Sequence, residues 1–357
     1  MSPRFHSLEI ADVRRETADA VSLGFRVPAD LEDAYRFEAG QYLTLKAEIG
    51  GAEVRRSYSI CAGADEGELR VAVKRIDGGA FSTFANEALK AGDRLDVMTP
   101  MGRFTTPAAP EAARLHVAIA CGSGITPVIS LAKTLLAREP QSRFILLYGN
   151  RTTADILFRD ELAALKDQHL DRFSVFHVLS RETQDLPVLN GRLDAEKLAL
   201  LLRSVAPAAL ADTVFLCGPE GMIVAAEQVL ASLGVDPARI HSERFLAAGD
   251  GPRPATAPKA AGARAHAIAE IILDGRHHKV PVAEGEMVID AAIRAGLDLP
   301  YSCKGGMCCT CRAKLVSGKV EMGLNYSLQP DEVAAGYVLT CQSMPTTPDV
   351  TLDYDAV

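Results

Sequence analysis

The chain has 357 residues, of which 48% are hydrophobic and 24% are charged, and its formal net charge is −8. These values are typical of a globular protein with two or three domains, and the acidic balance argues against nucleic acid as a partner. No apolar run is long enough to cross a bilayer, and the first residues lack the apolar core of a signal peptide. We therefore expect a cytoplasmic protein with no membrane partner, in which the eight cysteines do not form a disulfide framework.

The first hundred residues alternate apolar and polar side chains over short stretches that end in turn residues. This pattern predicts strands at 7–13, 21–27, 41–47, 68–74 and 93–98. Strands of this length and spacing favour a small antiparallel β-barrel.

Two motifs lie within this barrel region. Arg56, Ser57, Tyr58 and Ser59 form an R-x-Y-S sequence, and on a strand Arg56 and Tyr58 would share one face. An arginine suits a phosphate group, and a tyrosine suits a flat ring. Further on, Gly78 and Gly79 predict a turn before a helix at 82–89. Ser82 would then cap that helix, whose free amides could also bind an anion.

These motifs resemble the FAD-binding domain of the ferredoxin–NADP reductase superfamily. The resemblance implies that Arg56 holds the FAD pyrophosphate and that Tyr58 packs on the isoalloxazine. It implies that Ser59 reaches the flavin edge near N5, as a catalytic residue. It also assigns the pyrophosphate to a second segment, which contributes Val73, Lys74, Gly79, Phe81 and Ser82.

A proline-rich stretch at 107–110 marks a domain boundary, after which apolar strands alternate with helical patterns. We predict strands at 115–120, 144–148, 173–179 and 214–217, helices at 128–138 and 158–167, and a further helix opening at 218–222. This alternation indicates βαβ units and a parallel sheet.

Glycine-rich turns follow the first and the last of these strands. Gly122 and Gly124 precede Thr126 and Pro127 in a sequence similar to the G-I-T-P turn of the same superfamily. The resemblance implies that this turn approaches the nicotinamide dinucleotide pyrophosphate. Cys217, Gly218 and Pro219 match the family's C-G-P turn, in which the cysteine lies beside the nicotinamide and acts by positioning. A buried cysteine that ends a strand can also be an ordinary small core residue.

Two further segments are assigned by resemblance alone. Ser180 and Arg181, with Arg151 nearby, would grip the 2′-phosphate of NADPH, although a pair of exposed arginines in an NADH-dependent protein is the alternative. Glu243 would lie near the flavin. Phe245 would either cover the flavin or lie near the adenine.

Residues 246–265 are rich in Ala, Gly and Pro and lack an apolar period, which predicts a linker. The expected domains are therefore a flavin barrel at 1–107, a nicotinamide domain at 108–245, the linker at 246–265, and a C-terminal domain at 266–357. That last part is the more acidic, with 12 Asp and Glu against 7 Lys and Arg from His266 onward. Its acidic surface could serve docking or simply solubility.

The C-terminal part contains Cys303, Cys308 and Cys311 in a C-x4-C-x2-C spacing, followed at a distance by Cys341. This spacing is typical of plant-type [2Fe–2S] clusters. Gly305 and Gly306 would allow positive φ and bring amides toward the sulfurs, and a strand at 336–341 would deliver Cys341. A structural zinc site or unrelated buried thiols are the alternatives. Cys309 is interpreted as a packed bystander. The region resembles a plant-type ferredoxin with a β-grasp fold.

The resemblance covers almost the whole chain. It implies a reductase in which NAD(P)H gives a hydride to FAD and single electrons pass through the cluster to a partner. Within the superfamily, residues 5–8, 34–37, 148–152 and 325–332 resemble the corresponding segments of the reductase components of phenylacetyl-CoA epoxidases. This resemblance implies a di-iron oxygenase component as acceptor. One alternative is a reductase with the same domain order that serves another oxygenase or a hybrid-cluster protein. The other is a non-catalytic binding protein whose fold is stabilised by a bound metal.

Overall fold

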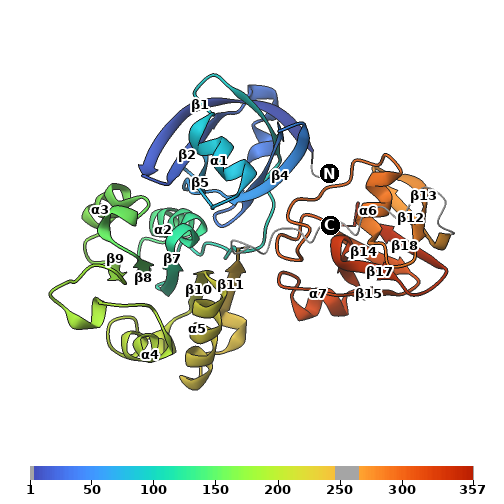
Figure 1. Cartoon of the computed structure of the whole chain (residues 1–357). Helices are drawn as coiled ribbons and strands as arrows, with labels where there is room; N and C mark the ends of the chain where they lie inside the picture. The colour runs from blue at the N-terminus through green and yellow to red at the C-terminus, as the bar shows by residue number, and fades with distance from the viewer. Residues whose placement is uncertain (1–3, 246–264, 357) are drawn as a thin grey trace. The chain divides into compact units, whose positions relative to one another are not determined.

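The computed structural model describes residues 4–245 and 265–356 (Figure 1). Contacts divide the chain into two compact units. The first contains residues 7–54 and 58–245, and the second contains the described residues 4–6, 55–57 and 265–356. The predicted linker at 246–265 falls almost entirely outside the described residues, and the predicted domain boundaries stay predictions.

The N-terminal part is the predicted antiparallel barrel. Its sheet has the strand order β4-β3-β6-β1-β2-β5. An antiparallel bridge between Ile60, just after β4, and Val71 of β5 brings the two edges of the sheet together. The strands are β1 (Phe5–Thr17), β2 (Ala20–Arg26), β3 (Tyr42–Ile49), β4 (Ala52–Ser59), β5 (Leu69–Lys74) and β6 (Arg94–Met98), and the helix is α1 (Ala80–Glu87).

The next part is the predicted parallel sheet, with the strand order β11-β10-β7-β8-β9. Helices α2 and α3 pack on one face and α4 and α5 on the other (Figure 1). Helix α4 and strand β11 were not predicted. The strands are β7 (Leu115–Cys121), β8 (Arg143–Asn150), β9 (Phe173–Leu179), β10 (Thr213–Gly218) and β11 (Ile240–Arg244), and the helices are α2 (Ile125–Arg138), α3 (Arg159–Gln168), α4 (Ala195–Ser204) and α5 (Glu220–Ser232).

The strand order creates a switch point at β7. The chain goes from β7 to β8 on one side and later returns to β10 on the other, so the carboxyl ends of β7 and β10 are neighbours. Ligands in open α/β sheets bind at such a point. The two glycine-rich turns predicted from sequence both begin there.

The connection between barrel and parallel sheet is fixed by a buried carboxylate, Glu139, just after α2. It accepts hydrogen bonds from the amide of Ala109 at 3.0 Å and the hydroxyl of Ser142 at 2.6 Å, and it contacts Arg114 and His116. Burial opposes ionisation, but the hydrogen bonds from Arg114 and Ser142 outweigh it and lower the pKa of Glu139 to about 2. The C-terminal end of α2 is therefore tied to the connecting segment by a charged group.

The C-terminal part has a five-stranded sheet in the order β13-β12-β18-β14-β16, a two-stranded sheet of β15 and β17, and helix α6 on the core. This arrangement fits the expected β-grasp plan. The strands are β12 (Ala265–Leu273), β13 (Arg276–Ala283), β14 (Arg312–Ser317), β15 (Val320–Met322), β16 (Tyr337–Leu339), β17 (Ser343–Pro345) and β18 (Asp349–Asp353), and the helices are α6 (Val288–Arg294) and α7 (Pro330–Ala334).

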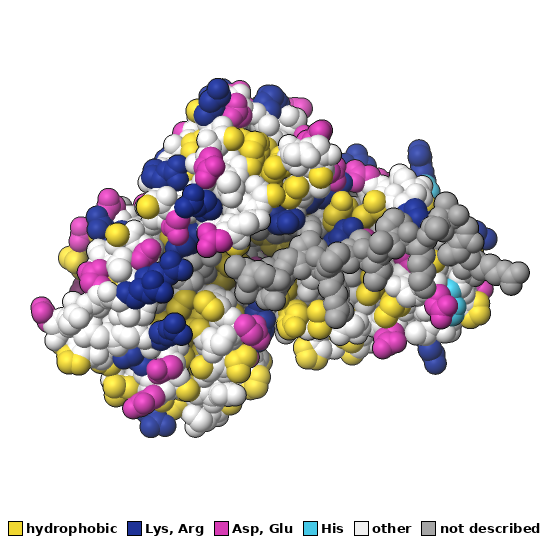
Figure 2. Space-filling model, in the orientation of Figure 1, with side chains coloured by type: hydrophobic (Ala, Val, Ile, Leu, Met, Phe, Trp, Pro, Cys, Tyr) yellow, Lys and Arg dark blue, Asp and Glu magenta, His cyan; other side chains and the backbone are white. Residues whose placement is uncertain are grey.

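Acidic and basic side chains are interspersed over the face of the molecule drawn in Figure 2. Within residues 4–245 and 265–356, no helix combines the length and apolar character that a bilayer crossing needs.

Candidate functional site

Strand β4 carries the R-x-Y-S motif at its end. The Tyr58 ring is half-buried, and its centroid lies 5.6 Å from that of Phe81, which is 1% exposed. Arg56 donates from Nη1 to the carbonyl of Arg55 at 2.7 Å. Phe81 belongs to the barrel core and supports Tyr58 from behind, which gives a rigid aromatic surface suited to stacking.

Helix α1 begins two residues earlier than predicted, at Ala80, and the assignment of Ser82 as its cap is wrong. Gly79 is the N-cap and offers no side chain to the first amides. Ser82 lies inside the helix, where its hydroxyl accepts from the amide of Ile76 at 3.1 Å and donates to the carbonyl of Gly79 at 3.2 Å. Ser82 therefore fixes the turn before the helix, and the uncapped amides of α1 form an end that suits an anion.

The two strand residues assigned to the same segment lie next to this turn. Val73 is buried in the barrel core, so only its backbone can reach a ligand, and its carbonyl already accepts from Asn86 at 3.0 Å. The ammonium of Lys74 is 3.5 Å from Asp19.

Ser59 and Cys217 are brought together by a third residue, Glu243. The hydroxyl of Ser59 donates to Oε2 of Glu243 at 3.2 Å, across the boundary between barrel and parallel sheet. Glu243 lies on β11 directly beside Cys217 on β10. Burial raises the pKa of Glu243 to about 7, and burial next to that carboxylate raises the pKa of the Cys217 thiol well above its usual range. The site thus holds a neutral thiol beside a carboxyl group that can exchange a proton near neutral pH.

The turns after β7 and β10 are packed against each other. Gly122 has a φ of +54°, and its carbonyl accepts from the hydroxyl of buried Tyr148 at 3.0 Å. The Thr126 hydroxyl donates to the carbonyl of Ser123 at 3.0 Å, so it holds the turn closed. Pro219 is the N-cap of α5. Burial raises the pKa of neighbouring Cys121 to about 12, so this thiol is neutral at physiological pH.

Gly124 is the position where this packing leaves no room. A Cβ at Gly124 would lie 2.2 Å from the carbonyl oxygen of Cys217. We expect Gly124→Ala to push the two turns apart and to slow flavin reduction by nicotinamide about 100-fold, the cost of misplacing reactants by about 1 Å. Stopped-flow absorbance measures this rate. Gly221→Ala is the control, because a Cβ there meets no atom within 4 Å; equal rates in both variants would contradict the packing argument.

Arg151 and Arg181 extend from the carboxyl ends of β8 and β9. The amide of Arg181 donates to the carbonyl of Arg151 at 2.8 Å, and the amide of Ser180 donates to the carbonyl of Asn150 at 3.0 Å. Both arginine side chains are exposed. The parallel backbone pairing thus continues past the strands and places Arg151 and Arg181 on neighbouring segments.

A pocket of about 430 Å³ lies between the loops that follow β8 and β9 and is lined in part by Thr153, Leu179 and Glu182. Glu182 accepts from the amide and hydroxyl of Thr153, each at 2.7 Å. This link between the loops after β8 and β9 was not predicted, because nothing in the local sequence indicates that Glu182 pairs with a residue 29 positions away.

In the C-terminal part, the four predicted cysteines lie as two pairs. Hydrogen bonding from Cys308 lowers the pKa of Cys303 to about 6, and hydrogen bonding from Cys311 lowers the pKa of Cys341. The pKa values of the donor thiols are raised. Each pair thus offers one thiolate-like sulfur, as a metal ligand requires. In the part of the chain that the structure describes, no three Cys, His, Asp or Glu side chains converge on a point for one metal ion.

Polar groups point at these sulfurs. The amide of Gly305 donates to Sγ of Cys303 at 3.3 Å, the hydroxyl of Thr310 to Cys308 at 3.1 Å, and the side-chain amide of Gln342 to Cys341 at 3.8 Å. Such donors stabilise the negative charge of a thiolate-bound cluster. Two close pairs of sulfurs with hydrogen-bond donors around them fit the four thiolate ligands that a [2Fe–2S] cluster needs.

Two expectations for this loop need correction. Gly306 has a positive φ of +78°, but Gly305 does not; Lys304 and Cys309 take the left-handed conformation instead. Cys341 does not lie on a strand, because β16 ends at Leu339 and residues 340–342 form a 3-10 turn. The hydroxyl of Thr340 donates to the carbonyl of Cys311 at 2.9 Å, which bends the chain toward the cysteine loop. Cys309 packs against the domain core.

Three family models match the chain. Residues 7–106 match an oxidoreductase FAD-binding domain, residues 118–228 an oxidoreductase NAD-binding domain, and residues 271–346 a 2Fe-2S iron-sulfur cluster binding domain. The chain is 46% identical over 353 residues to one of the subunits of the 1,2-phenylacetyl-CoA epoxidase of Escherichia coli, and the match covers 99% of this chain and 98% of that protein. The chain belongs to the family of oxygenase reductase components.

Other relatives agree with this assignment. The reductase is 37% identical over 358 residues to the ferredoxin reductase component of a 3-ketosteroid-9-alpha-monooxygenase from Mycobacterium tuberculosis, covering 98% of this chain and 95% of that protein. Its fold resembles that of phthalate dioxygenase reductase, with a TM-score of 0.58, 24% identity and 98% coverage of both chains. The expected three-part fold and its oxidoreductase character are therefore confirmed.

In the reductase, Phe245 directly follows the last strand of the parallel sheet, is half-buried and packs against the apolar cluster shared by barrel and sheet. This position is compatible with either role expected for Phe245. The Ser59–Glu243 hydrogen bond could not be predicted in detail, because strand β11 itself carries no strong strand pattern.

Proposed function

We propose that this chain is an NADPH-dependent cytoplasmic reductase that passes electrons through FAD and a [2Fe–2S] cluster to the di-iron oxygenase component of a phenylacetyl-CoA epoxidase. The observation that carries the proposal is the convergence of Ser59, Glu243 and Cys217 in a chain that also holds two pairs of buried thiols. The domain boundaries 1–107, 108–245 and 266–357 are part of the proposal.

FAD, when bound, supplies the conversion of a two-electron hydride into single electrons. Arg56 and the uncapped end of α1 would hold its pyrophosphate, and Tyr58, backed by Phe81, would support its ring. The glycines of the two turns let the dinucleotide approach. Cys217 packs beside the nicotinamide as a neutral thiol.

Oxidation of NADPH by two one-electron acceptors releases one proton per turnover. Ser59 Oγ and Glu243 Oε2 form a path for that proton, because Ser59 can pass it to a carboxyl group whose pKa is about 7. When a cluster is bound, Cys303, Cys308, Cys311 and Cys341 would be its four thiolate ligands.

The proposed preference for NADPH rests on the paired backbone of Arg151 and Arg181. Guanidinium groups recognise phosphate by charge-assisted hydrogen bonds. We expect Arg181→Ala to raise the KM for NADPH about tenfold, the factor that corresponds to losing one hydrogen bond to a charged group. The KM for NADH should change little. Steady-state kinetics with both nucleotides test this, and an equal effect on both would assign Arg181 to another part of the site.

The acceptor is proposed from the relative that is 46% identical, whose name specifies phenylacetyl-CoA epoxidase. The decisive experiment mixes the purified chain with NADPH and the epoxidase oxygenase component, and follows epoxide formation from phenylacetyl-CoA. Electron transfer to a 3-ketosteroid or glycine betaine oxygenase component instead would keep the reductase function and change its partner. A protein without flavin absorbance would overturn the function.

A further inference from the structure

Helix α2 connects the nicotinamide site to the barrel. Its N-terminal end carries the Gly122–Gly124 turn, and its later turns carry polar residues at positions 130, 133, 134 and 138. Residues spaced by three and four lie on one helical face. All four of these side chains contact one short barrel segment, residues 62–66, which follows the flavin strand β4.

Two of the four contacts are hydrogen bonds between helix hydroxyls and barrel backbone, the first buried and the second partly buried. The hydroxyl of Ser130, which is fully buried, donates to the carbonyl of Ala62 at 2.6 Å. The hydroxyl of Thr134 accepts from the amide of Ala64 at 2.9 Å. Each pairs a helix side chain with barrel backbone, so losing either would leave a backbone polar group without its partner.

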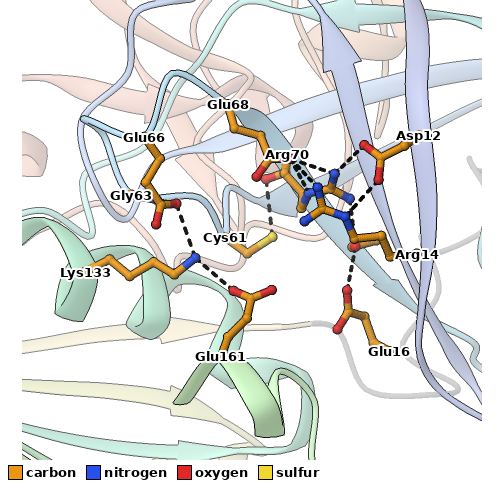
Figure 3. Close-up of polar contacts among 11 residues, drawn as sticks. Asp12, Arg14, Glu16, Cys61, Gly63, Glu66, Glu68, Arg70, Lys133 and Glu161 are labelled. Carbon is orange, nitrogen blue, oxygen red and sulfur yellow. Dashed lines mark hydrogen bonds and ion pairs between the residues drawn. The ribbon is translucent and has the colours of Figure 1, made fainter. Parts of the chain in front are cut away.

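The other two contacts are ion pairs. Lys133 lies between the carboxylates of Glu66, at 3.2 Å, and Glu161 of α3, at 2.8 Å (Figure 3). Arg138 binds Asp65 through two hydrogen bonds of 2.6 and 2.7 Å. Glu161 orients Lys133 toward the barrel, and the two-point contact of Arg138 restricts rotation about the helix end.

The segment is rigid on the barrel side and lies tight against the helix. The amide of Cys61 donates to the carbonyl of Arg70 at 2.9 Å, and Glu66 folds back to accept from the amide of Gly63 at 2.7 Å. A Cβ at Gly63 would lie 3.1 Å from Cβ of Lys133. The segment therefore cannot follow a moving helix without breaking barrel contacts.

We propose that Ser130, Lys133, Thr134 and Arg138, bound to residues 62–66, form a clamp that sets the position of the nicotinamide turn relative to the flavin strand. These are positioning residues, because none of them lies in the proposed cofactor or substrate contacts. The clamp acts through α2, whose other end begins at Gly124, packed against Cys217. It fixes the distance and angle at which the hydride donor meets the flavin, and transfer rates depend steeply on both.

The first test measures hydrogen exchange and does not require catalytic turnover. Thr134→Val removes the acceptor for the Ala64 amide at almost constant volume. Hydrogen exchange at Ala64 should therefore accelerate about fivefold, the factor that corresponds to a net hydrogen-bond contribution of about 1 kcal/mol. Ser232→Ala is the control: its hydroxyl donates to Val229 within α5, away from the clamp. Unchanged exchange at Ala64 in Thr134→Val would overturn the clamp.

The second test measures hydride transfer. Ser130→Ala and Thr134→Val should each slow flavin reduction about tenfold, while FAD content and the dissociation constant for NADP⁺ stay near the wild-type values. Asp65→Arg and Arg138→Asp should each slow flavin reduction by a smaller factor. The double variant D65R/R138D should restore the wild-type rate of flavin reduction, because it forms the exposed ion pair with the charges exchanged. Arg26→Glu, which breaks the exposed Arg26–Glu9 pair inside the barrel, is the matched control.

The inference rests on the proposed hydride transfer between nicotinamide and flavin, and the two can fail separately. If the wild-type chain does not reduce its flavin, the proposed function fails. If it does, but the clamp variants react as fast as wild type, or the double variant stays as slow as the single ones, the clamp is refuted.

Discussion

Cys341→Ser is expected to abolish the [2Fe–2S] absorbance and paramagnetic signal while FAD remains bound and reducible by NADPH. Cys341 lies beside Cys311 and is proposed as one of the four cluster ligands, and a serine hydroxyl is a poorer ligand than a thiolate for iron–sulfur chemistry. Electron delivery to the oxygenase component should then be almost completely lost. Iron and sulfide content, electron paramagnetic resonance and reduction of ferricyanide by the flavin measure these quantities separately.

Cys309→Ser is the matched control, because Cys309 adjoins the ligands in the same loop but packs on the domain core. It should keep the cluster and the electron delivery. A variant at Cys309 that loses iron as Cys341→Ser does would show that the four-ligand assignment is incorrect.

Glu243→Gln is expected to lower the rate of steady-state electron delivery about 100-fold. This factor is the lower end of the rate enhancement that a positioned proton acceptor typically supplies. Since burial raises the pKa of Glu243 to about 7, its carboxylate is available only at higher pH. The wild-type rate should therefore rise as pH increases through about 7, and the rate of the glutamine variant should not. Rate–pH profiles on both sides of that pKa test this, and identical profiles would exclude Glu243 from proton transfer.

Thermal unfolding supplies an independent check on Glu243. A carboxyl group whose pKa is higher in the folded than in the unfolded chain binds more protons when folded, so stability falls as pH rises from about 4.5 through about 7. Wild type should lose stability relative to Glu243→Gln over this window. Parallel curves would mean that Glu243 ionises normally in the folded protein.

Local motifs could be predicted from the sequence because they depend only on residues that are neighbours in the chain. The cysteine spacing, the Gly122 turn and the alternation of strands and helices each depend on a few adjacent positions, and the fold that they predict is confirmed. Ser82 was wrongly assigned as the helix cap, because a serine near a helix start can either cap the helix or lie in its first turn. The observed hydrogen bond from Ser82 to the carbonyl of Gly79 shows that it lies in the first turn.

Residues that act across long separations in sequence could not be predicted. Ser130 forms a hydrogen bond with Ala62, which is 68 positions away in the sequence, and Ser59 forms one with Glu243, which is 184 positions away. Such pairs exist only once two domains pack together. The 3-10 turn at Cys341 has a similar origin, because a bond from Thr340 to Cys311, 29 positions earlier, ends the strand.

The contact between residues 62–66 and α2 also limits how modules of this protein can be exchanged. A chimera that replaces the nicotinamide domain at the apparent boundary near residue 107 would join a foreign helix to the native barrel segment. Its hydroxyls and charges would meet unmatched carbonyls and carboxylates. A recombination that transfers residues 62–66 together with α2 preserves the fit, so a module that carries the nicotinamide turns has to include a piece of the flavin barrel.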